Sequence, residues 1–447
     1  MPSLSYGGIT MKQRRSVAGE LITFSMPLIL SGILQQLYSL ADAFIVGHSG
    51  PEGEMMLAAV GATGNITFFL INTVIGFTLG LSILSAQEYG RGNISAIRSV
   101  TTAFLPILAV FYTVLSAASI FFIEPILRMM NTPPEIFDYS REYLLVVLIG
   151  IPFLAVYNLF SGLFRAVGNT KAAFYSIFIS SLLNIALDVL FVLVFPWGVA
   201  GAAAATVLSQ IAMTVFLGLY GKACYPQLMP RKGAAEKAIV RAGISFGIPP
   251  AVQNSVTSFG NLILQNFTNS FGAITVLAVT TAYRVDGLIL LPIFNLGAAI
   301  SSLAAQAKGA GDTARMRNYL TTGMKLMLGI SAVLTVVTYV FGADFIAFFG
   351  VTGQALAEGR VFFEDLSLFY IFFGIATVFR SVLEGIGDIT YCSAIGVVSL
   401  ALRIAASYLL APFAAERTIA FAEGIAWCVL LLFTAVRIYC KRSEFSL

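Results

Sequence analysis

Charged residues are scarce in this chain. Only 11% of its 447 residues are Asp, Glu, Lys or Arg, whereas 58% are hydrophobic. A soluble protein typically has about 25% charged residues, which it needs to cover its surface with polar groups. Long apolar stretches recur along the whole length instead of forming one local anchor. The composition therefore argues against a large water-soluble fold and predicts a protein that crosses a membrane many times.

Residues that build metal centres and disulfide frameworks are also few. The chain has four cysteines (Cys224, Cys392, Cys428 and Cys440) and one histidine, His48. The cysteine spacing fits neither a zinc knuckle nor a disulfide framework, so helix packing is the expected role. A single histidine argues against a His-based metal site and a Ser–His–Asp triad, and no Gly-rich phosphate loop is present. We therefore expect no bound cofactor and no enzymatic activity.

The apolar stretches are long enough for transmembrane helices. A helix needs ~20 residues to cross the hydrocarbon core, and every backbone polar group in lipid must be paired within the segment. We therefore predict an all-α membrane protein with twelve transmembrane helices. The expected spans are 21–46, 56–83, 98–123, 140–164, 171–195, 198–220, 242–269, 275–304, 318–349, 361–383, 391–411 and 419–439.

Positive charge is distributed unevenly between the two sets of connections. One set, with the two chain ends, holds Lys12, Arg14, Arg15, Arg91, Arg98, Arg165, Lys171, Lys222, Arg231, Lys232, Lys237, Arg241, Lys308, Arg315, Arg317, Lys325, Arg437, Lys441 and Arg442. The other set holds only Arg128, Arg141, Arg360 and Arg417. Because Lys and Arg are retained on the cytoplasmic side, we predict that both termini are cytoplasmic. The net charge of +4 then reflects topology and not a nucleic-acid partner, and no removable signal peptide is expected.

The two halves of the chain resemble each other. Gln87–Asn93 aligns with Gln306–Asp312, and at the same offset Leu183–Ala186 aligns with Leu402–Ala405. Six spans in each copy give both copies the same orientation, so the repeat is parallel, with a pseudo-two-fold axis along the membrane normal and a cleft between the halves. The predicted parts are an N-terminal six-helix lobe at 1–220, a cytoplasmic linker at 221–241 and a C-terminal six-helix lobe at 242–447.

The copies differ at polar positions inside the predicted spans. Asp42, Asp188 and Thr206 of the first copy align with Leu264, Ser407 and Val429 of the second. Ser181, Asn184 and Asp188 are spaced i, i+3, i+7 and share one helical face. A carboxylate at the bilayer centre costs about 2.5–3.5 kcal/mol, which Asn or Thr would avoid. Two such carboxylates indicate a site that shares a proton or binds a cation; the alternative is hydrogen bonding between packed helices.

In these segments the chain resembles the multidrug and toxic compound extrusion (MATE) family, within the wider group of polysaccharide and lipid-linked flippases. The resemblance covers nearly the whole chain. It is carried, in this order, by Pro27, Gln35, Gln36 and Asp42, then by Gln87–Gly90, Arg165–Thr170, Leu183–Asp188 and Trp197–Ala203. The resemblance implies a V-shaped pair of six-helix lobes that expels organic, often cationic or amphipathic, compounds while protons or sodium ions flow inward.

The resemblance also implies a cation site in the N-terminal lobe. The corresponding positions all bear oxygen atoms here: Asp42, Tyr143, Ser181, Asn184, Asp188 and Thr206. Sodium, if it is the coupling ion, would take Asp42, Asn184, Asp188 and Thr206. In some members, protonation of the aspartate in helix one is proposed to bend that helix near the position of Pro27, and a proline there makes a hinge reasonable.

One branch of the family differs from this chain. NorM-like and eukaryotic members have a glutamate in helix seven shortly after the proline, whereas Pro249–Ser255 contains no acid. Coupling through a carboxylate of helix seven is therefore not expected. The chain is more similar to the DinF-like branch.

Further polar residues fall in the predicted spans. Gln35, Gln36, Asn158, Arg284 and Asp286 are candidates for the substrate cleft. Arg284 and Asp286 are two residues apart and do not share a helical face, so they need not pair with each other. For these two we favour pairing with other groups over a place in the cleft.

Other charges lie elsewhere in the spans or at their ends. The sequence leaves two alternatives for the acids Asp286, Glu364, Asp365 and Glu384: they take part in coupling, or they do not. We expect Glu384 and Asp388, and in the same way Glu88 and Arg91, to be solvated charges at the cytoplasmic ends of helices.

These observations predict a cation-coupled antiporter, driven by protons or sodium, that exports small organic compounds by alternating access. We expect it to work as a monomer in the cell membrane. One alternative is a flippase for a lipid-linked precursor, although such proteins often have extra helices or a strongly basic cleft. A channel is a further alternative, which passive conductance would reveal. An enzyme is disfavoured because no nucleophile–base pair falls within the spans.

Overall fold

The computed structural model describes residues 16–231, 233 and 235–445. In these ranges the chain forms helices joined by short connections, without a strand. The all-α fold predicted from the sequence is therefore confirmed for the described part of the chain. Four basic residues of the topology argument, Lys12, Arg14, Arg15 and Lys232, lie outside the described residues.

The described residues of the first half form seven α-helices. They are α1 (Val17–Gly47), α2 (Gly53–Gly90), α3 (Ile94–Phe121), the short α4 (Ile123–Met129), α5 (Pro134–Ala166), α6 (Thr170–Asp188) and α7 (Gly198–Cys224). A π-helical segment, η1 (Val189–Val194), continues α6. A 3₁₀ turn, η2 (Pro226–Leu228), lies in the connection to the second half.

In the second half, the part of the chain that the structure describes forms eight α-helices. They are α8 (Lys237–Asn269), α9 (Ala273–Ile289), α10 (Leu291–Gly309), α11 (Thr313–Phe348), α12 (Gly353–Ser367), α13 (Tyr370–Gly385), α14 (Ile389–Ala414) and α15 (Thr418–Cys440). Two 3₁₀ turns, η3 (Ala415–Arg417) and η4 (Arg442–Phe445), precede and follow α15.

Each of the twelve predicted spans coincides with one helix or with one bent pair of helices. The span predicted at 275–304 is the pair α9 and α10, bent by 43°, and the span at 361–383 is the pair α12 and α13, bent by 49°. By length and composition, eight helical stretches of the described residues could cross a membrane, or ten if each bent pair counts as one span. The membrane fold is thus confirmed, whereas twelve remains a predicted number.

The turns at one end of the molecule repeat four times. In each turn a glycine with positive φ (Gly92, Gly168, Gly311 or Gly387) precedes the N-cap residue of the next helix. The side chains of Asn93, Asn169 and Asp312 cap three of these helices by accepting a backbone N–H three residues ahead. Glycine supplies the left-handed backbone and the short polar side chain supplies the cap. The repeat seen in the sequence is therefore largely a repeat of helix ends.

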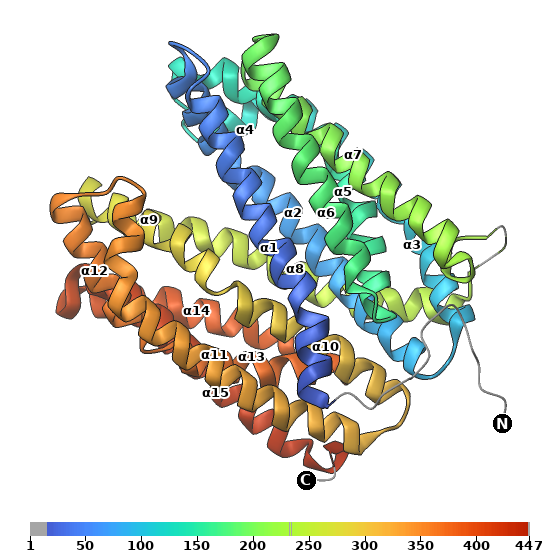
Figure 1. The fold of residues 1–447 in the computed structure, drawn as a ribbon. Helices are drawn as coiled ribbons and strands as arrows, with labels where there is room; N and C mark the ends of the chain where they lie inside the picture. The colour runs from blue at the N-terminus through green and yellow to red at the C-terminus, as the bar shows by residue number, and fades with distance from the viewer. Residues whose placement is uncertain (1–15, 232, 234, 446–447) are drawn as a thin grey trace.

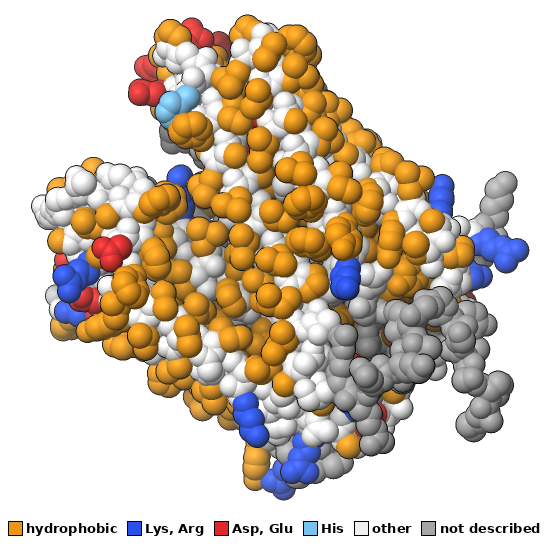
Figure 2. Space-filling model, viewed as in Figure 1, with side chains coloured by type: hydrophobic (Ala, Val, Ile, Leu, Met, Phe, Trp, Pro, Cys, Tyr) orange, Lys and Arg blue, Asp and Glu red, His pale blue; other side chains and the backbone are white. Residues whose placement is uncertain are grey.

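The two lobes exchange contacts through their first helices. α1 packs against α6 of its own lobe and against α10 of the other, while α8 packs against α14 of its own lobe and against α2 of the other. The helices diverge at the end where α4, α9 and α12 lie and converge toward the end that carries the chain termini (Figure 1). Between the diverging ends the space-filling view shows a hollow, and hydrophobic side chains cover most of this face (Figure 2).

The two lobes approach each other closely where α2 crosses α10. A Cβ atom on Gly90 would collide with the backbone oxygen of Gln306, and one on Gly309 would collide with that of Gln87. Gln87 donates to the carbonyl oxygen of Gly385 at the end of α13 (2.8 Å), and Gln306 donates to that of Ala166 at the end of α5 (2.8 Å). A glutamine of each lobe thus donates a hydrogen bond to the backbone of the other lobe, and both bonds lie near the crossing of α2 and α10.

The charges expected to be solvated at this end are instead paired. Glu88 is 5% exposed and forms an ion pair with Arg91. Glu384 accepts from Arg380 (2.8 Å), and Asp388 accepts from Arg437 (2.6 Å). The prediction of solvated charges was wrong for the three acids, because neighbouring helices cover them and a covered carboxylate needs a partner. Arg91 is exposed, as predicted.

Candidate cation and substrate site

The polar residues predicted on one face of a helix lie on α6. Because α6 is helical from Thr170 to Asp188, Ser181, Asn184 and Asp188 follow one another along the same side. α6 packs against α1, which carries Asp42, and against α7, which carries Thr206. The small residues of Gly198–Ala205 let α7 approach closely, and Gly201 lies against the backbone of Phe191.

Asp188 marks a change in the backbone. It is the last residue of α6 and directly precedes the π-helical segment η1. Phe195 donates its N–H to Leu190 (2.9 Å) and Trp197 to Phe191 (2.8 Å), so the turns here are wider than in an α-helix. Segments of π-helix often accompany functional sites because they redirect side chains. The sequence pattern predicted the helix but not this change.

The buried polar atoms around Asp188 are not hydrogen-bonded to the protein. The side chain of Asp188 is fully buried, and those of Asn184 and Ser181 are 2% and 5% exposed. Within the described part of the chain, the atoms without a hydrogen-bond partner include Asp42 Oδ1, Ser181 Oγ, both amide atoms of Asn184, both carboxylate oxygens of Asp188, Ser209 Oγ and Gln210 Oε1. Buried polar atoms are nearly always paired, so such a concentration indicates a place for a ligand, ion, proton or water.

The carboxyl groups of Asp42 and Asp188 are near enough for their negative charges to repel each other. Both carboxylates also interact electrostatically with the phenol of Tyr143 of α5, and Asp42 interacts in the same way with Tyr38, one turn earlier on α1. The four predicted elements α1, α5, α6 and α7 thus bring their polar side chains to one region of the N-terminal lobe. Two carboxylates in such a buried place repel each other unless a proton or a cation lies between or on them.

A cavity of about 170 Å³ opens beside these residues. Its polar lining consists of Gln35, Tyr38, Tyr157, Asn158, Ser180, Ser181, Asn184, Thr206, Ser209 and Gln210, and its apolar lining of Ile71, Ile75, Leu154, Ile177 and Met213. The predicted cleft residues Gln35 and Asn158 therefore lie with the predicted cation residues Ser181, Asn184 and Thr206.

Several lining residues were missed from the sequence. Tyr38 lies one turn before Asp42, and Ser209 and Gln210 lie three and four residues after Thr206. Helical neighbours of a polar residue at these spacings share its face, so the i, i+3, i+4 rule applied to Asp42 and Thr206 would have found them.

The remaining predicted residues lie elsewhere. Gln36 faces Gly287 of α9 and does not line the cavity. Arg284 is exposed, whereas Asp286 is 5% exposed, so the two point to different sides of α9 as expected. α1 continues unbroken through Pro27, whose carbonyl oxygen accepts from Ser31 Oγ (2.7 Å).

The acids left open in the second lobe have partners. Asp365 accepts two hydrogen bonds from Arg417 (2.8 and 2.7 Å), and Glu364 accepts from Arg360 (2.7 Å). Glu384 is paired with Arg380, which also donates to Gln253 of α8 (2.8 Å).

The C-terminal lobe has a buried polar network of its own. Arg403 of α14 donates to Glu423 of α15 (3.0 Å) and to the hydroxyl of Tyr283 of α9 (2.8 Å), and Tyr283 donates to Glu423 (2.9 Å). Tyr370 of α13 donates to Asp286 of α9. Each of these five side chains therefore has a protein partner.

The chemistry available to the N-terminal cavity is the binding of ions and polar groups. Its lining offers amide, hydroxyl and phenol groups, whereas the carboxylates of Asp42 and Asp188 belong to the neighbouring buried cluster and do not line the cavity. No three His, Cys, Asp or Glu residues come together as metal ligands anywhere in the described ranges. Hard oxygen donors with one or two carboxylates suit a proton or an alkali cation better than a transition metal.

Comparisons with known proteins agree with this architecture. A family model, MatE, matches residues 27–190 and 249–409. The chain is 28% identical over 420 residues to the probable multidrug resistance protein YpnP of Bacillus subtilis, covering 92% of each chain. It is 26% identical over 382 residues to the probable multidrug resistance protein NorM of Thermotoga maritima, covering 83% of this chain and 80% of that protein. A MOP superfamily transporter from Pyrococcus furiosus has the same fold, with a TM-score of 0.90 and 20% identity over 97% of this chain and 98% of that one.

Proposed function

Because the chain belongs to the MatE family of membrane transporters, we propose that it exports organic compounds in exchange for an inward-moving cation. Relatives along most of its length are multidrug resistance proteins, and its fold is that of MATE transporters. The family thus supports an exporter, and not an enzyme, in a bacterial-type cell membrane. The coupling ion, the substrate class and the transport cycle are our proposal.

The observation that carries cation coupling is the cluster of buried, unpartnered polar atoms in the N-terminal lobe. Leaving one buried polar atom unpaired costs about 1–3 kcal/mol, and more for a charged group. Asp42, Asn184 and Asp188 alone contribute five such atoms within the described residues. An ion or proton bound among them removes much of this cost, so the site gains affinity for a cation from the way the lobe is built.

The lining of the cavity matches the chemistry of an organic substrate. Its apolar wall, which includes Ile71, Ile75 and Met213, suits the body of an amphipathic molecule, and the amides of Gln35 and Asn158 provide a few polar contacts. Ser181, Asn184 and Thr206 line the cavity and belong to the proposed cation site. Cation and substrate therefore compete for the same side chains, and this competition supplies the difference in affinity that coupling requires.

The arrangement of the lobes supports transport by alternating access. The lobes hold each other where α2 crosses α10 and diverge at the opposite end. With both termini in the cytoplasm, as the positive charges predict, this form opens outward and its cytoplasmic side is closed. Rocking of the lobes would break the contacts of Gln87 and Gln306 and expose the cavity to the other side.

Efflux of a cationic dye from proteoliposomes tests the proposal. We expect accelerated efflux under an inward gradient of protons or of sodium, imposed separately, and we expect Asp188→Asn to remove the acceleration. Efflux that responds to neither gradient, or that responds equally in Asp188→Asn, would contradict cation coupling at this site. Dye movement without any gradient, with ionic conductance in a planar bilayer, would instead identify a channel.

A further inference from the structure

Basic residues at the end that carries the chain termini are paired differently in the two lobes. On the C-terminal lobe most of them have an acidic partner, in the ion pairs Lys308–Glu444, Arg315–Glu20, Arg380–Glu384, Arg437–Asp388 and Lys441–Glu444. On the N-terminal lobe and the linker, five exposed basic residues form no ion pair within the described residues: Lys171, Lys222, Arg231, Lys237 and Arg241. The N-terminal lobe and its linker therefore carry most of the unpaired positive charge at this end.

Two of these lysines, Lys171 and Lys222, lie at neighbouring helix ends. Lys171 is the second residue of α6, and Lys222 is in the last turn of α7, which packs against α6. Asn169, the N-cap residue of α6, donates from its side-chain amide to the hydroxyls of Tyr220 (2.9 Å) and Tyr225 (3.2 Å). These hydrogen bonds join the start of α6 to the end of α7, so the two lysines are held at the same end of this helix pair.

An exposed apolar stripe runs along α6 from Lys171. Tyr175, Phe178 and Leu182 follow this lysine at i+4, i+7 and i+11, which places them on one helical face. All three side chains are exposed. On a membrane helix such a face contacts lipid, and a tyrosine one turn from a lysine is typical of the level of the headgroups.

α7 has a stripe of the same kind. Leu219, Val215 and Leu208 precede Lys222 by three, seven and fourteen residues, share its helical face and are exposed. Hydrophobic side chains cover the face of the molecule over α6 and α7 (Figure 2). Each of the two helices therefore presents an apolar stripe that ends in a lysine at the same end of the molecule. A phospholipid has the matching pattern, with acyl chains followed by a phosphate.

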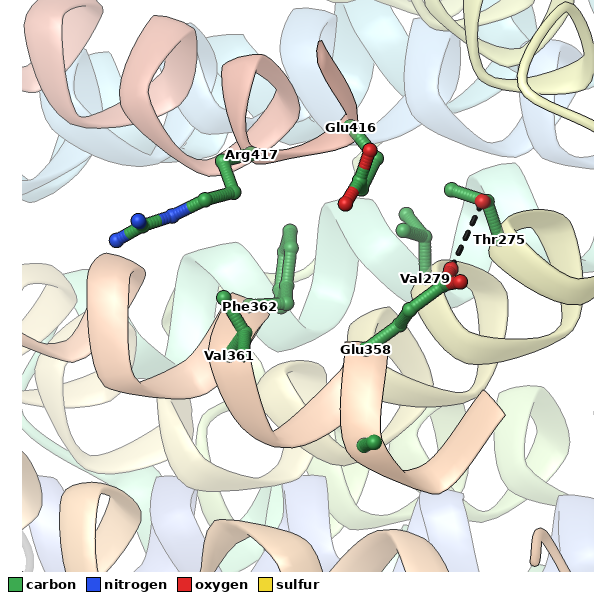
Figure 3. Close-up of a pocket in the computed structure, with 8 residues that line it drawn as sticks. Thr275, Val279, Glu358, Val361, Phe362, Glu416 and Arg417 are labelled. Carbon is green, nitrogen blue, oxygen red and sulfur yellow. Dashed lines mark hydrogen bonds between the residues drawn. The ribbon is translucent and has the colours of Figure 1, made fainter. Parts of the chain in front are cut away.

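The opposite end of the molecule does not offer this pattern in its pocket of the C-terminal lobe. Glu358, which accepts from Thr275 (2.8 Å), and Glu416 line that pocket (Figure 3). Arg417 also lines it, but its guanidinium is bound by Asp365 at 2.7 and 2.8 Å. A phosphate would meet carboxylates there, which repel it.

We propose that Lys171 and Lys222 bind the phosphate of an anionic phospholipid, whose acyl chains lie along the exposed stripes of α6 and α7. Each lysine near an anionic membrane surface strengthens binding about fivefold. A zwitterionic lipid gains less, because its own ammonium group opposes the two lysines. A second copy of this chain on the same surface would bring like charges together at one membrane end, which disfavours it as the occupant. The site lies on the outside of the lobe and does not rest on the proposed function.

Native mass spectrometry of the whole protein in a neutral detergent tests the proposal with two lipids of identical acyl chains. We expect phosphatidylglycerol to bind about 25-fold more tightly than phosphatidylcholine, because two lysines act on its charge. Lys171→Gln and Lys222→Gln should each weaken the binding of phosphatidylglycerol about fivefold, and Lys171→Arg should retain it. The matched control is Lys237→Gln, at an exposed lysine that begins α8, and it should keep the wild-type affinity.

Three outcomes of this titration would overturn the proposal. Equal affinity of the wild type for both lipids would show that the charge of the lipid is not recognised. An equal loss in Lys237→Gln would show that positive charge anywhere at this end suffices. A dimer that forms through this surface and excludes the lipid would make a second copy the occupant.

Inorganic phosphate distinguishes a lipid site from a general anion site. We expect it not to displace phosphatidylglycerol at equal concentration, because it lacks the acyl chains that contact the stripes of α6 and α7. Displacement at equal concentration would contradict the assignment to a lipid.

Fluorescence quenching locates the bound lipid. In a background with Trp197→Phe and Trp427→Phe, which removes both tryptophans of the chain, Tyr175→Trp places a single fluorophore one turn from Lys171. In vesicles, phosphatidylglycerol with brominated acyl chains should quench it more than brominated phosphatidylcholine at the same mole fraction. This difference should disappear when Lys171→Gln and Lys222→Gln are combined.

Equal quenching by the two brominated lipids with both lysines present would show that the anionic lipid is not bound at this surface. None of these measurements needs a substrate or an ion gradient, so a failure of coupled efflux leaves their outcomes unaffected. The substituted side chains are exposed, so the variants are expected to fold.

Discussion

The two lobes follow one repeated pattern but differ in how their buried charged groups are paired. In the N-terminal lobe, Asp188 and Asn184 are buried without a protein partner within the described residues. In the C-terminal lobe, the position aligned with Asn184 is Arg403, whose guanidinium is bound by Glu423 and Tyr283. In the second lobe the positive charge is the guanidinium of Arg403, which is a tethered cation because it belongs to the protein itself. In the first lobe the side chains are instead ligands for a cation that comes from solution.

The backbone differs between the lobes in a matching way. α6 of the first lobe ends in a π-helical segment at Asp188, whereas its counterpart α14 is an α-helix throughout. Conversely, α2 and α5 are continuous whereas the aligned pairs α9–α10 and α12–α13 are bent. Irregular backbone therefore lies next to the buried acid in each lobe, at Asp188 in one and at Asp286 in the other.

The largest expected difference between the lobes is the effect of replacing Asp188. We expect Asp188→Asn to lower gradient-driven dye efflux by at least about 100-fold, because it removes a charge without which the cation has no strong ligand. The matched control in the other lobe is Asp365→Asn, which should leave coupling within about twofold. Initial rates in proteoliposomes measure both. Equal losses in the two variants would mean that the site is no more special than any buried acid.

The tethered cation of the C-terminal lobe is tested by Arg403→Asn, which introduces the residue of the other lobe. Removing one partner of a buried ion pair costs about 3–5 kcal/mol, because Glu423 is left buried and unmatched. We expect a large drop in thermal stability in detergent, and partial recovery in the double variant Arg403→Asn with Glu423→Gln. Additive losses in the double variant would show that the two side chains are not coupled.

The crossing that joins the lobes should be sensitive to a single methyl group. Gly90→Ala places a Cβ against the backbone of Gln306, which cannot rotate away. Overpacking of this kind costs about 1–3 kcal/mol, so the closed end should open in a larger fraction of molecules. Spin labels on either side of the crossing measure that fraction. Gly329→Ala on α11, where a Cβ meets no atom within 4 Å, is the control and should leave the distance distribution unchanged.

The smallest expected effect is on the free energy of unfolding, which replacement of two serines should change in opposite directions. Ser209 of α7 has a buried hydroxyl without a partner in the described chain, whereas Ser407 of α14 donates to the carbonyl oxygen of Arg403 (2.9 Å). In the absence of substrate and at low sodium, Ser209→Ala should stabilise the protein by about 1 kcal/mol, and Ser407→Ala should destabilise it by about as much. Thermal unfolding of the two variants measures these changes in stability. A change of the same sign in both variants would contradict the difference in hydrogen bonding between the two serines.

Much of the fold could be predicted from the sequence, because a bilayer restricts the choice of structure. Apolar runs of sufficient length predicted helices, and each predicted span coincides with a helix or a bent pair. The grouping of Ser181, Asn184 and Asp188 followed from helical spacing, and their approach to Asp42 followed from the family resemblance.

Other features depend on contacts between distant segments and could not be predicted in this way. Whether Glu88 or Asp388 is solvated is decided by the helices that cover it, and the pattern within one helix does not contain that information. The same holds for the break at Leu368–Phe369, which has no proline beside it. The break at Leu290 could have been predicted, because Pro292, the second residue of α10, has no N–H to continue the preceding helix. Tyr38, Ser209 and Gln210 could have been predicted, because helical spacing places them on the same faces as Asp42 and Thr206.

Counting the ions bound by the purified protein tests the account's central claim most directly. Bound sodium can be measured with a radioactive tracer and bound protons with a pH indicator, in the wild type, in Asp188→Asn and in Asp365→Asn. The account predicts that Asp188→Asn loses one exchangeable cation per chain while Asp365→Asn retains the wild-type number. Full occupancy in Asp188→Asn would show that the unpaired polar atoms of the first lobe are not where the driving ion binds.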